Sequence, residues 1–544
     1  MSIEFTPWPV ELAERYREKG YWLGKPLTDI LYKQCQIQPE AIAIICGDRK
    51  FSYHQLDQQS SALATNLTLA GIKRGDTAIV QLPNIAEFYI TFFALLKMGV
   101  VPINALFSHN KLELLAYAQQ IDPSLIVLSS EHSLLQNNHF LEQLKTDCPR
   151  LRNIVVDGRK IQYVNELYTN ELKPWLESTD LPLNFEATRS DEVAFFQLSG
   201  GSTGTPKLIP RTHDDYYYSV RRSVEICELT QQTRYLCALP AQHNYPLSSP
   251  GALGVFYAGG CVILATDPGP TTCFPLIREH QVTMTSLVPS AVALWIQAIR
   301  KYEYSLESLQ LLQVSGAKLS ESVARVIPKL FSCKLQQIFG MAEGLVCYTR
   351  LNDDDERIFT TQGSPMSEDD EVRIVDDNGN IQAPGSTGML IVRGPYTFRG
   401  YYKSPEHNSK VFDKEGFYYC GDLAYMTKEG YVCIVGREKD QINRGGEKIA
   451  AEEIESLLLK HEGIIHSALV AMPDPLLGEK SCAFIVAADP NITGLQLRKY
   501  LRGLGIAEYK LPDRFEMIDV MPVTPVGKTN KLLLRKIIRD KLEN

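Results

Sequence analysis

Up to about residue 435, the chain alternates short apolar runs with longer segments of mixed polarity. The apolar runs are rich in β-branched residues and lie at 76–82, 124–130, 152–158, 261–266 and 282–288. Short hydrophobic strands that alternate with helical segments are typical of α/β folds with largely parallel sheets. The pattern therefore predicts a large α/β part built of layered subdomains.

Two changes in this pattern divide the remaining chain. Segment 371–394 contains two β-rich runs around an Asp-Asn-Gly turn, which predicts an antiparallel hairpin or a small β-barrel-like subdomain. A charged run at 437–440 then leads to a Gly-Gly pair and an amphipathic helix that begins near Ala451. We expect an N-terminal domain at 1–437 and a small, mobile α+β domain at 438–544. From composition alone, residues 437–440 also fit a polar surface loop.

Composition narrows the class of protein. A chain of 544 residues is too long for one hydrophobic core, and its net charge of -8 gives no basic footprint for nucleic acid or anionic lipid. No apolar stretch reaches the length of a membrane span, and the first residues do not resemble a secretory signal. The twelve cysteines include no C-x-x-C pair, which argues against zinc sites and disulfides. We expect a cytoplasmic protein that binds neither nucleic acid nor membranes.

A glycine- and hydroxyl-rich loop is the first candidate for chemistry. Segment 198–207, LSGGSTGTPK, follows a strand-like run and ends in a lysine, which suits an anion such as a phosphate. The loop is not a Walker A motif, because Pro206 precedes Lys207 and Leu208 follows it. A flexible surface turn without a ligand explains the composition equally well.

Other candidate groups are weak when each is taken alone. His243 lies in AQHNYPLSSPG, Glu343 follows a strand-like run in IFGMAEG, and Lys528 follows a glycine near the C-terminus. Asp422 in YYCGDL and Arg437 in GREKD complete the set. A buried structural histidine, a loop carboxylate and a solvated lysine are the ordinary interpretations of such residues.

The order of these motifs along the chain resembles that of the adenylate-forming superfamily. Within it, HNYPLSSPG and QQIFGMAEGLVCYTR resemble the stand-alone enzymes that join 2,3-dihydroxybenzoate to AMP. The resemblance implies two reactions in one site: an aryl acid reacts with ATP and Mg²⁺ to give an aryl-adenylate and pyrophosphate, and a phosphopantetheine thiol then accepts the aryl group. The implied partner is an aryl carrier protein of nonribosomal siderophore assembly, located on another chain.

The resemblance also assigns roles to residues on the nucleotide side. Lys528 and His243 take the catalytic positions, and Glu343 takes the position of the Mg²⁺ ligand. A carboxylate and a triphosphate repel each other, so a lysine at the reacting centre would stabilise developing charge. The implied nucleotide-binding residues are Gly200, Gly201, Ser202, Thr203, Gly204, Thr205, Lys207, Ala317, Lys318, Phe339, Gly340, Met341, Ala342, Asp422, Arg437 and Lys528.

In the implied acid pocket, Asn244 is the most informative residue. Relatives that activate amino acids carry an aspartate there to pair with the substrate ammonium, whereas an amide suits an acid without an α-amino group. Asn244 would bond a 2-hydroxyl, and Ser249 with Val346 would accommodate a 3-hydroxyl, which favours 2,3-dihydroxybenzoate over salicylate. Tyr245 and Gly316 would line the ring slot. Ser249 also fits an ordinary helix N-cap before Pro250.

The two reactions need different groups in one site, so the resemblance implies domain alternation. Lys439 and Asp440 match the hinge, and Gly445 and Gly446 match the residues that face the pantetheine tunnel. Three alternatives remain at this point: a salicylate-activating enzyme, an aryl-CoA ligase of the same fold, and a nucleotide-binding regulatory protein without catalysis.

Overall fold

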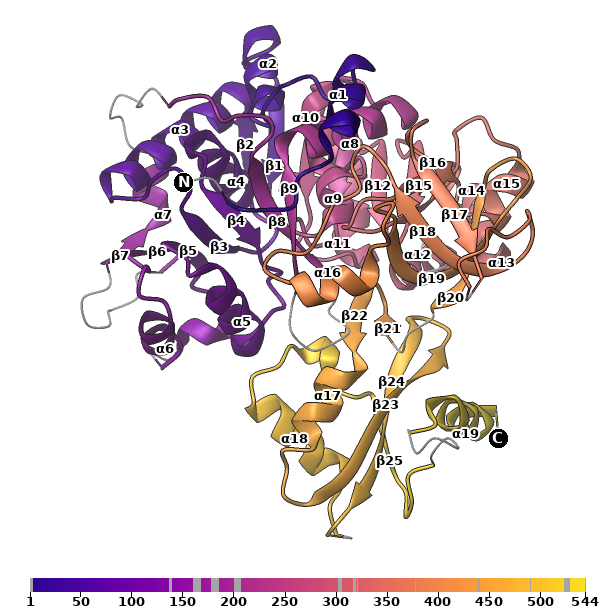
Figure 1. The fold of residues 1–544 in the computed structure, drawn as a ribbon. Helices are drawn as coiled ribbons and strands as arrows, with labels where there is room; N and C mark the ends of the chain where they lie inside the picture. The colour runs from indigo at the N-terminus through magenta and orange to yellow at the C-terminus, as the bar shows by residue number, and fades with distance from the viewer. Residues whose placement is uncertain are drawn as a thin grey trace.

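The computed structural model describes all residues except 1–2, 137–138, 160–167, 178–184, 200–206, 302–305, 317–318, 320, 377, 438–440, 490, 523–528 and 544. A large N-terminal part lies above a smaller C-terminal part in Figure 1. The large part contains three sheets, and the small part has a sheet of its own. The predicted α/β class is confirmed.

The first sheet of the large part has seven strands in the order β7-β6-β5-β3-β4-β8-β9. Its neighbouring strands are parallel except for the β8–β9 pair. Its strands are β3 (Thr77–Gln81), β4 (Val101–Asn104), β5 (Leu125–Ser129), β6 (Asn153–Asp157), β7 (Tyr168–Glu171), β8 (Val193–Ser199) and β9 (Lys207–Thr212).

The second sheet has nine strands in the order β16-β15-β14-β13-β12-β10-β11-β1-β2. It is parallel at its centre and antiparallel at both edges. Its strands are β1 (Ile42–Cys46), β2 (Arg49–Ser52), β10 (Arg234–Cys237), β11 (Cys261–Leu264), β12 (Met284–Leu287), β13 (Leu311–Val314), β14 (Lys334–Gly340), β15 (Val346–Tyr348) and β16 (Ser364–Pro365).

Helices join these two sheets into one core. Helix α4 (Ala86–Met98) is buried along almost its whole length, in one apolar cluster with residues of β1, β3, β10 and β11. A helix that is apolar on all sides needs partners on all sides. The other helices of the large part are α1 (Val10–Glu18), α2 (Asp29–Ile37), α3 (Tyr53–Leu69), α5 (Lys111–Ile121), α6 (His139–Asp147), α7 (Leu172–Leu176), α8 (His213–Ile226), α9 (Asn244–Ser248), α10 (Gly251–Ala258), α11 (Pro270–His280), α12 (Pro289–Lys301), α13 (Glu321–Ala324), α14 (Ile327–Phe331), α15 (Asp355–Thr360) and α16 (Pro405–Val411).

The hairpin or small β-barrel-like subdomain predicted at 371–394 corresponds to part of a four-stranded antiparallel sheet, β17-β18-β19-β20. The two β-rich runs pair as predicted, with Val375 opposite Met389, but the connection between them is longer than a tight turn. The strands are β17 (Glu371–Val375), β18 (Gly388–Arg393), β19 (Tyr418–Met426) and β20 (Val432–Arg437).

The small part begins with hairpin β21–β22 and contains separate apolar clusters of its own. Its sheet runs β22-β21-β24-β23, with β25 parallel to β24. The predicted helix at Ala451 is present. The boundary at 437/438 stays a prediction, because residues 438–440 lie outside the described chain. The elements are β21 (Gln441–Arg444), β22 (Glu447–Ala450), α17 (Ala451–Leu458), β23 (Ile464–Asp474), β24 (Gly478–Ala487), α18 (Gly494–Gly503), β25 (Arg514–Met517) and α19 (Lys531–Glu543).

Two expectations from composition can be compared with the fold. All twelve cysteines are free thiols, and most are buried. Within the described part of the chain, no helix combines the length and the apolar composition needed to cross a bilayer.

Candidate active site

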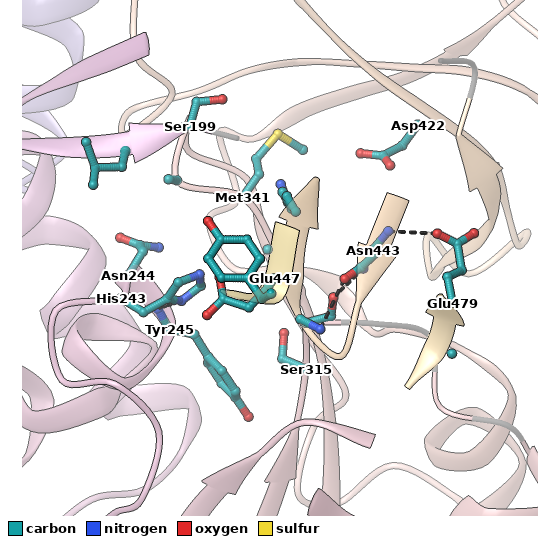
Figure 2. A pocket seen from close by; sticks show the side chains of 18 of the residues that line it. Ser199, His243, Asn244, Tyr245, Ser315, Met341, Asp422, Asn443, Glu447 and Glu479 are labelled. Carbon is teal, nitrogen blue, oxygen red and sulfur yellow. Dashed lines mark hydrogen bonds between the residues drawn. The ribbon is translucent and has the colours of Figure 1, made fainter. Parts of the chain in front are cut away.

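A cavity of about 660 Å³ lies where the large and small parts meet. Its walls come from the carboxyl ends of strands β4, β8, β13 and β14 and from hairpin β21–β22 of the small part (Figure 2). Ligand sites of α/β proteins commonly lie at the carboxyl ends of sheet strands. The predicted site residues that line the cavity are His243, Asn244, Tyr245, Ser249, Gly316, Phe339, Gly340, Met341, Ala342, Glu343, Asp422 and Gly446.

The remaining predicted residues fall into two groups. Lys207, Val346 and Gly445 are described but are not among the described residues that line the cavity. For Arg437, the structure describes only the backbone, which pairs with Asp422 across strands β19 and β20. Residues 200–205, Ala317, Lys318, Lys439, Asp440 and Lys528 lie outside the described residues.

Helix α9 forms one end of the cavity. It begins after His243, whose ring nitrogen accepts a hydrogen bond from the Tyr245 amide (3.4 Å), so consecutive residues of one short turn face the space. Ser249 closes the same turn. It does not cap the next helix, because Pro250 occupies the N-cap position of α10. Val346 packs in the same apolar cluster as Tyr245, behind this wall.

The other end of the cavity forms around strand β14. This strand ends at Gly340, and the turn that follows presents Met341, Ala342 and Glu343 to the cavity. Asp422 faces the same space from strand β19 of a different sheet and is 5% exposed. Carboxylates at this end can accept hydrogen bonds from hydroxyl donors or bind a hard cation.

Glu343 is bonded by a tyrosine that contacts a second tyrosine, and no sequence motif identified either of them. The Tyr401 hydroxyl donates to Glu343 Oε1 (2.8 Å) and lies 2.9 Å from the Tyr418 hydroxyl. The Lys207 ammonium lies 5.6 Å from the centre of the Tyr401 ring, which brings a cation close to this carboxylate. Among the described residues, no group of three or more His, Cys, Asp or Glu side chains is arranged to hold a metal ion. A divalent cation here would therefore need oxygen ligands from a bound molecule as well as from Glu343.

Hairpin β21–β22 closes the cavity from the small part. The Asn443 side-chain amide donates to the Gly316 carbonyl (2.6 Å), and its oxygen accepts from the Gly446 amide (3.2 Å). Gly316 has φ +88°, and a Cβ there would lie 3.6 Å from the Gly446 Cα. Gly446 has φ +97°, so both positions adopt a backbone conformation that favours glycine.

Enclosure changes the ionisation of two groups in the cavity. Desolvation lowers the pKa of His243 to about 4, and the charge of Lys448 acts in the same direction, so the imidazole is neutral at pH 7. The His243 side chain faces the cavity, and the two protein parts surround this cavity and shield the imidazole from bulk water. Desolvation also raises the pKa of Glu447 to about 7, against the opposing charge of Lys510.

A buried ion cluster, which the sequence did not reveal, joins the two parts beside this cavity. The Lys510 ammonium lies 3.0 Å from Glu113 of helix α5 and 2.9 Å from Glu453 of helix α17. Burial alone would lower the pKa of Lys510, but the two carboxylates outweigh burial and raise it. The three residues are more than 50 positions apart, so spacing in the sequence gave no signal.

The fold and the cavity together define an adenylate-forming enzyme with a large and a small part. The chain belongs to the AMP-binding enzyme family, which matches residues 31–402, and the C-terminal domain of that family matches residues 453–528.

Several known proteins are similar over the full chain. The identity is 56% to Enterobactin synthase component E of Escherichia coli (strain K12), covering 98% of each chain. It is 47% to 2,3-dihydroxybenzoate-AMP ligase of Bacillus subtilis (strain 168), covering 99% of this chain and 98% of that protein. Among solved structures, apo MbtA of Mycobacterium smegmatis is 39% identical with a TM-score of 0.76, and 98% of each chain is covered.

Proposed function

We propose that this enzyme activates 2,3-dihydroxybenzoate with ATP and then transfers the aryl group to the phosphopantetheine thiol of an aryl carrier protein in siderophore biosynthesis. Relatives named for 2,3-dihydroxybenzoate-AMP ligation and for enterobactin synthesis support this reaction. The observation that carries the proposal is Asn244, a neutral amide at the acid end of a cavity whose other end presents Glu343 and Asp422.

In the first reaction, a carboxylate oxygen of the acid attacks the α-phosphorus of ATP, and pyrophosphate leaves. Residues 200–205 and Lys207 would hold the phosphates, and Lys528 would stabilise the charge that develops between the two anions. Asp422 would accept hydrogen bonds from the ribose hydroxyls, and Phe339 would stack on the adenine. Glu343 would hold Mg²⁺, which supplies positive charge to the phosphate oxygens.

In the second reaction, the pantetheine sulfur attacks the acyl carbon and AMP leaves with the bonding electrons. The contacts of Asn443 and Gly446 with the Gly316 region support a role for the observed domain orientation in this step. Lys439 and Asp440 would form the hinge that exchanges this orientation for the one in which Lys528 enters the site. The neutral His243 would border the path of the thiol.

The choice of substrate rests on Asn244 and Ser249. The Ser249 hydroxyl would bond the 3-hydroxyl, so salicylate, which lacks that group, is expected to be a slower substrate. An aryl-CoA ligase remains the second candidate, because both enzymes use the same first reaction.

The direct test of this function is acid-dependent exchange of labelled pyrophosphate into ATP. We expect exchange with 2,3-dihydroxybenzoate, slower exchange with salicylate, and transfer to a pantetheinylated carrier protein rather than to free coenzyme A. Lys528→Ala should abolish exchange but still transfer supplied aryl-adenylate. Exchange at the wild-type rate in this variant would refute the assigned role of Lys528, and absence of exchange in the wild type would refute the function.

A further inference from the structure

Tyr216 lies directly behind Asn244, outside the cavity. It belongs to helix α8, is 1% exposed, and is not among the described residues that line the cavity. Its hydroxyl oxygen lies 2.8 Å from Asn244 Oδ1. Two residues that line the cavity, Asn244 and Gln197, bond this hydroxyl, so Tyr216 can act on a bound acid only through them.

The hydrogen bonds around Tyr216 define which end of the Asn244 amide faces the acid. The Gln197 side-chain amide donates to the Tyr216 oxygen (3.2 Å), and the single phenolic proton is then donated to Asn244 Oδ1. The Ser248 hydroxyl lies 3.5 Å from the same oxygen, but its shorter hydrogen bond goes to the Asn244 main-chain carbonyl (3.2 Å). With its oxygen satisfied from behind, the Asn244 amide directs its N–H donors into the cavity, as Figure 2 shows.

The opposite amide orientation fits these neighbours less well. With Asn244 Nδ2 toward Tyr216, the phenolic oxygen would face two amide donors, and its own proton would have to turn to the Ser248 hydroxyl. The Asn244 oxygen would then lose its shortest donor. The hydrogen bonds among Gln197, Tyr216 and Asn244 therefore favour one orientation.

The ring of Tyr216 is held so that its hydroxyl cannot move away. Phe195 packs against it edge-to-face with ring centres 4.7 Å apart, and the Arg211 guanidinium lies 5.2 Å from the ring centre. Arg211 is in turn fixed by Asp215 at 2.8 Å. The position of the hydroxyl is thus set by the core and not by the ligand.

We propose that Tyr216 is a specificity-determining positioning residue, which fixes the Asn244 amide as a hydrogen-bond donor and so selects aryl acids with an ortho oxygen over those with an ortho amine. This proposal rests on the proposed function, in which Asn244 contacts the ortho substituent. An ortho hydroxyl can turn its proton toward its own carboxylate and offer its oxygen lone pairs to Asn244. An ortho amine delocalises its lone pair into the ring and presents N–H groups to N–H groups.

The test compares two acids of nearly equal shape, 2-hydroxybenzoate and 2-aminobenzoate, in pyrophosphate exchange. Tyr216→Phe frees the Asn244 amide to turn. The kcat/KM for 2-hydroxybenzoate divided by the kcat/KM for 2-aminobenzoate should therefore fall by about tenfold or more. The change should come from KM for the acids, with KM for ATP unaltered. Tyr217→Phe is the matched control, because it removes a buried hydroxyl of the same helix that bonds Asp29 at 2.9 Å, and its ratio should stay at the wild-type value.

Two further variants separate positioning from a general loss of structure. In an Asn244→Ala background, adding Tyr216→Phe should leave the ratio unchanged, because no amide remains to be oriented. If Tyr216→Phe does not fold, Gln197→Met removes the donor that directs the phenolic proton and should lower the ratio by a smaller factor. Because Gln197 also lines the cavity, this fall supports the proposal only if it disappears in the Asn244→Ala background.

The outcomes distinguish this proposal from the proposed function. If the wild type activates the acids but the ratio is unchanged in Tyr216→Phe, the orienting role of Tyr216 is refuted. If Tyr216→Phe does not fold, an unchanged ratio in Gln197→Met refutes it. An equal fall in the Asn244→Ala background overturns it as well. A wild type that shows no acid-dependent exchange contradicts the proposed function itself.

Discussion

At the residue scale, two polar side chains of the cavity have tyrosine partners behind them. Glu343 is bonded by Tyr401, and Asn244 is bonded by Tyr216. The motif residues could be found from the sequence because their order matches a known superfamily. Tyr216 and Tyr401 could not, because their importance comes from contacts with residues 28 and 58 positions away.

The charge at position 244 is the first property to test. Asn244→Asp would place a carboxylate beside an acid whose own carboxylate lies nearby, with Tyr216 and Ser248 still donating to it. We expect kcat/KM for 2,3-dihydroxybenzoate to fall by about 100-fold in pyrophosphate exchange, because the substrate has no ammonium to compensate that charge. Asn244→Ser, which is neutral, should lose less activity. Equal kinetics for wild type and Asn244→Asp would remove this residue from the acid pocket.

At the element scale, strand positions could be predicted from local pattern and their neighbours could not. The five apolar runs named above contain strands β3, β5, β6, β11 and β12. The order in which strands lie side by side depends on contacts between distant segments, which hydrophobic periodicity does not encode. The docking of hairpin β21–β22 against Gly316 could not be predicted for the same reason, because it is a contact between distant segments. The sequence showed only the Gly445-Gly446 pair.

Hairpin docking has its own prediction. Asn443→Ala removes both the bond to the Gly316 carbonyl and the bond from the Gly446 amide. We expect transfer from preformed aryl-adenylate to the carrier protein to slow by about tenfold, while pyrophosphate exchange stays near the wild-type rate. Asn491→Ala is a suitable control, because Asn491 is an asparagine of the small part whose side chain bonds nearby Asp489. Equal slowing of both reactions would contradict a role restricted to transfer.

At the scale of the whole molecule, buried charge joins the two parts in the observed orientation. Glu113 comes from the large part, and Lys510 and Glu453 come from the small part. Burial would raise the pKa of Glu113, but the charges of Lys510 and His109 and the hydrogen bonds from Asn110 and Lys510 together outweigh burial and lower it. The sequence predicted two domains, but no pattern in it indicated which charges meet between them.

Removal of one charge from this cluster should weaken docking. Glu113→Gln leaves Lys510 with Glu453 alone, and we expect a loss of about 1–3 kcal/mol in the interdomain contact. Carrier-protein loading should slow more than pyrophosphate exchange. Glu508→Gln, which removes an exposed pair with Arg502 in the small part, is the control. Loading at the wild-type rate in Glu113→Gln would exclude this cluster from domain positioning.

Glu447 predicts a pH dependence of domain docking. The pKa of Glu447 rises from about 4.5 to about 7 in the docked orientation. At pH values between 4.5 and 7, docking is therefore coupled to the uptake of a proton by this carboxylate. Docking is therefore most favourable at low pH, weakens as pH rises toward 7, and changes little above that. The charged or titratable neighbours are Lys510, Tyr117 and Tyr509. The interdomain distance can be measured by fluorescence energy transfer from pH 5 to 8. It should increase as the pH rises toward 7 in the wild type and change less in Glu447→Gln. The same pH dependence in both proteins would contradict the role of Glu447.

A crystal structure of the enzyme with a non-hydrolysable mimic of dihydroxybenzoyl-AMP would decide whether the cavity between the two parts is the adenylation site. We expect the aryl ring to lie between Asn244, Tyr245 and Ser249, with the Asn244 amide nitrogen on the 2-hydroxyl. We expect the ribose to contact Asp422 and the adenine to lie against Phe339. A mimic bound outside this cavity, or bound in it with the aryl ring away from Asn244, would refute the proposed site.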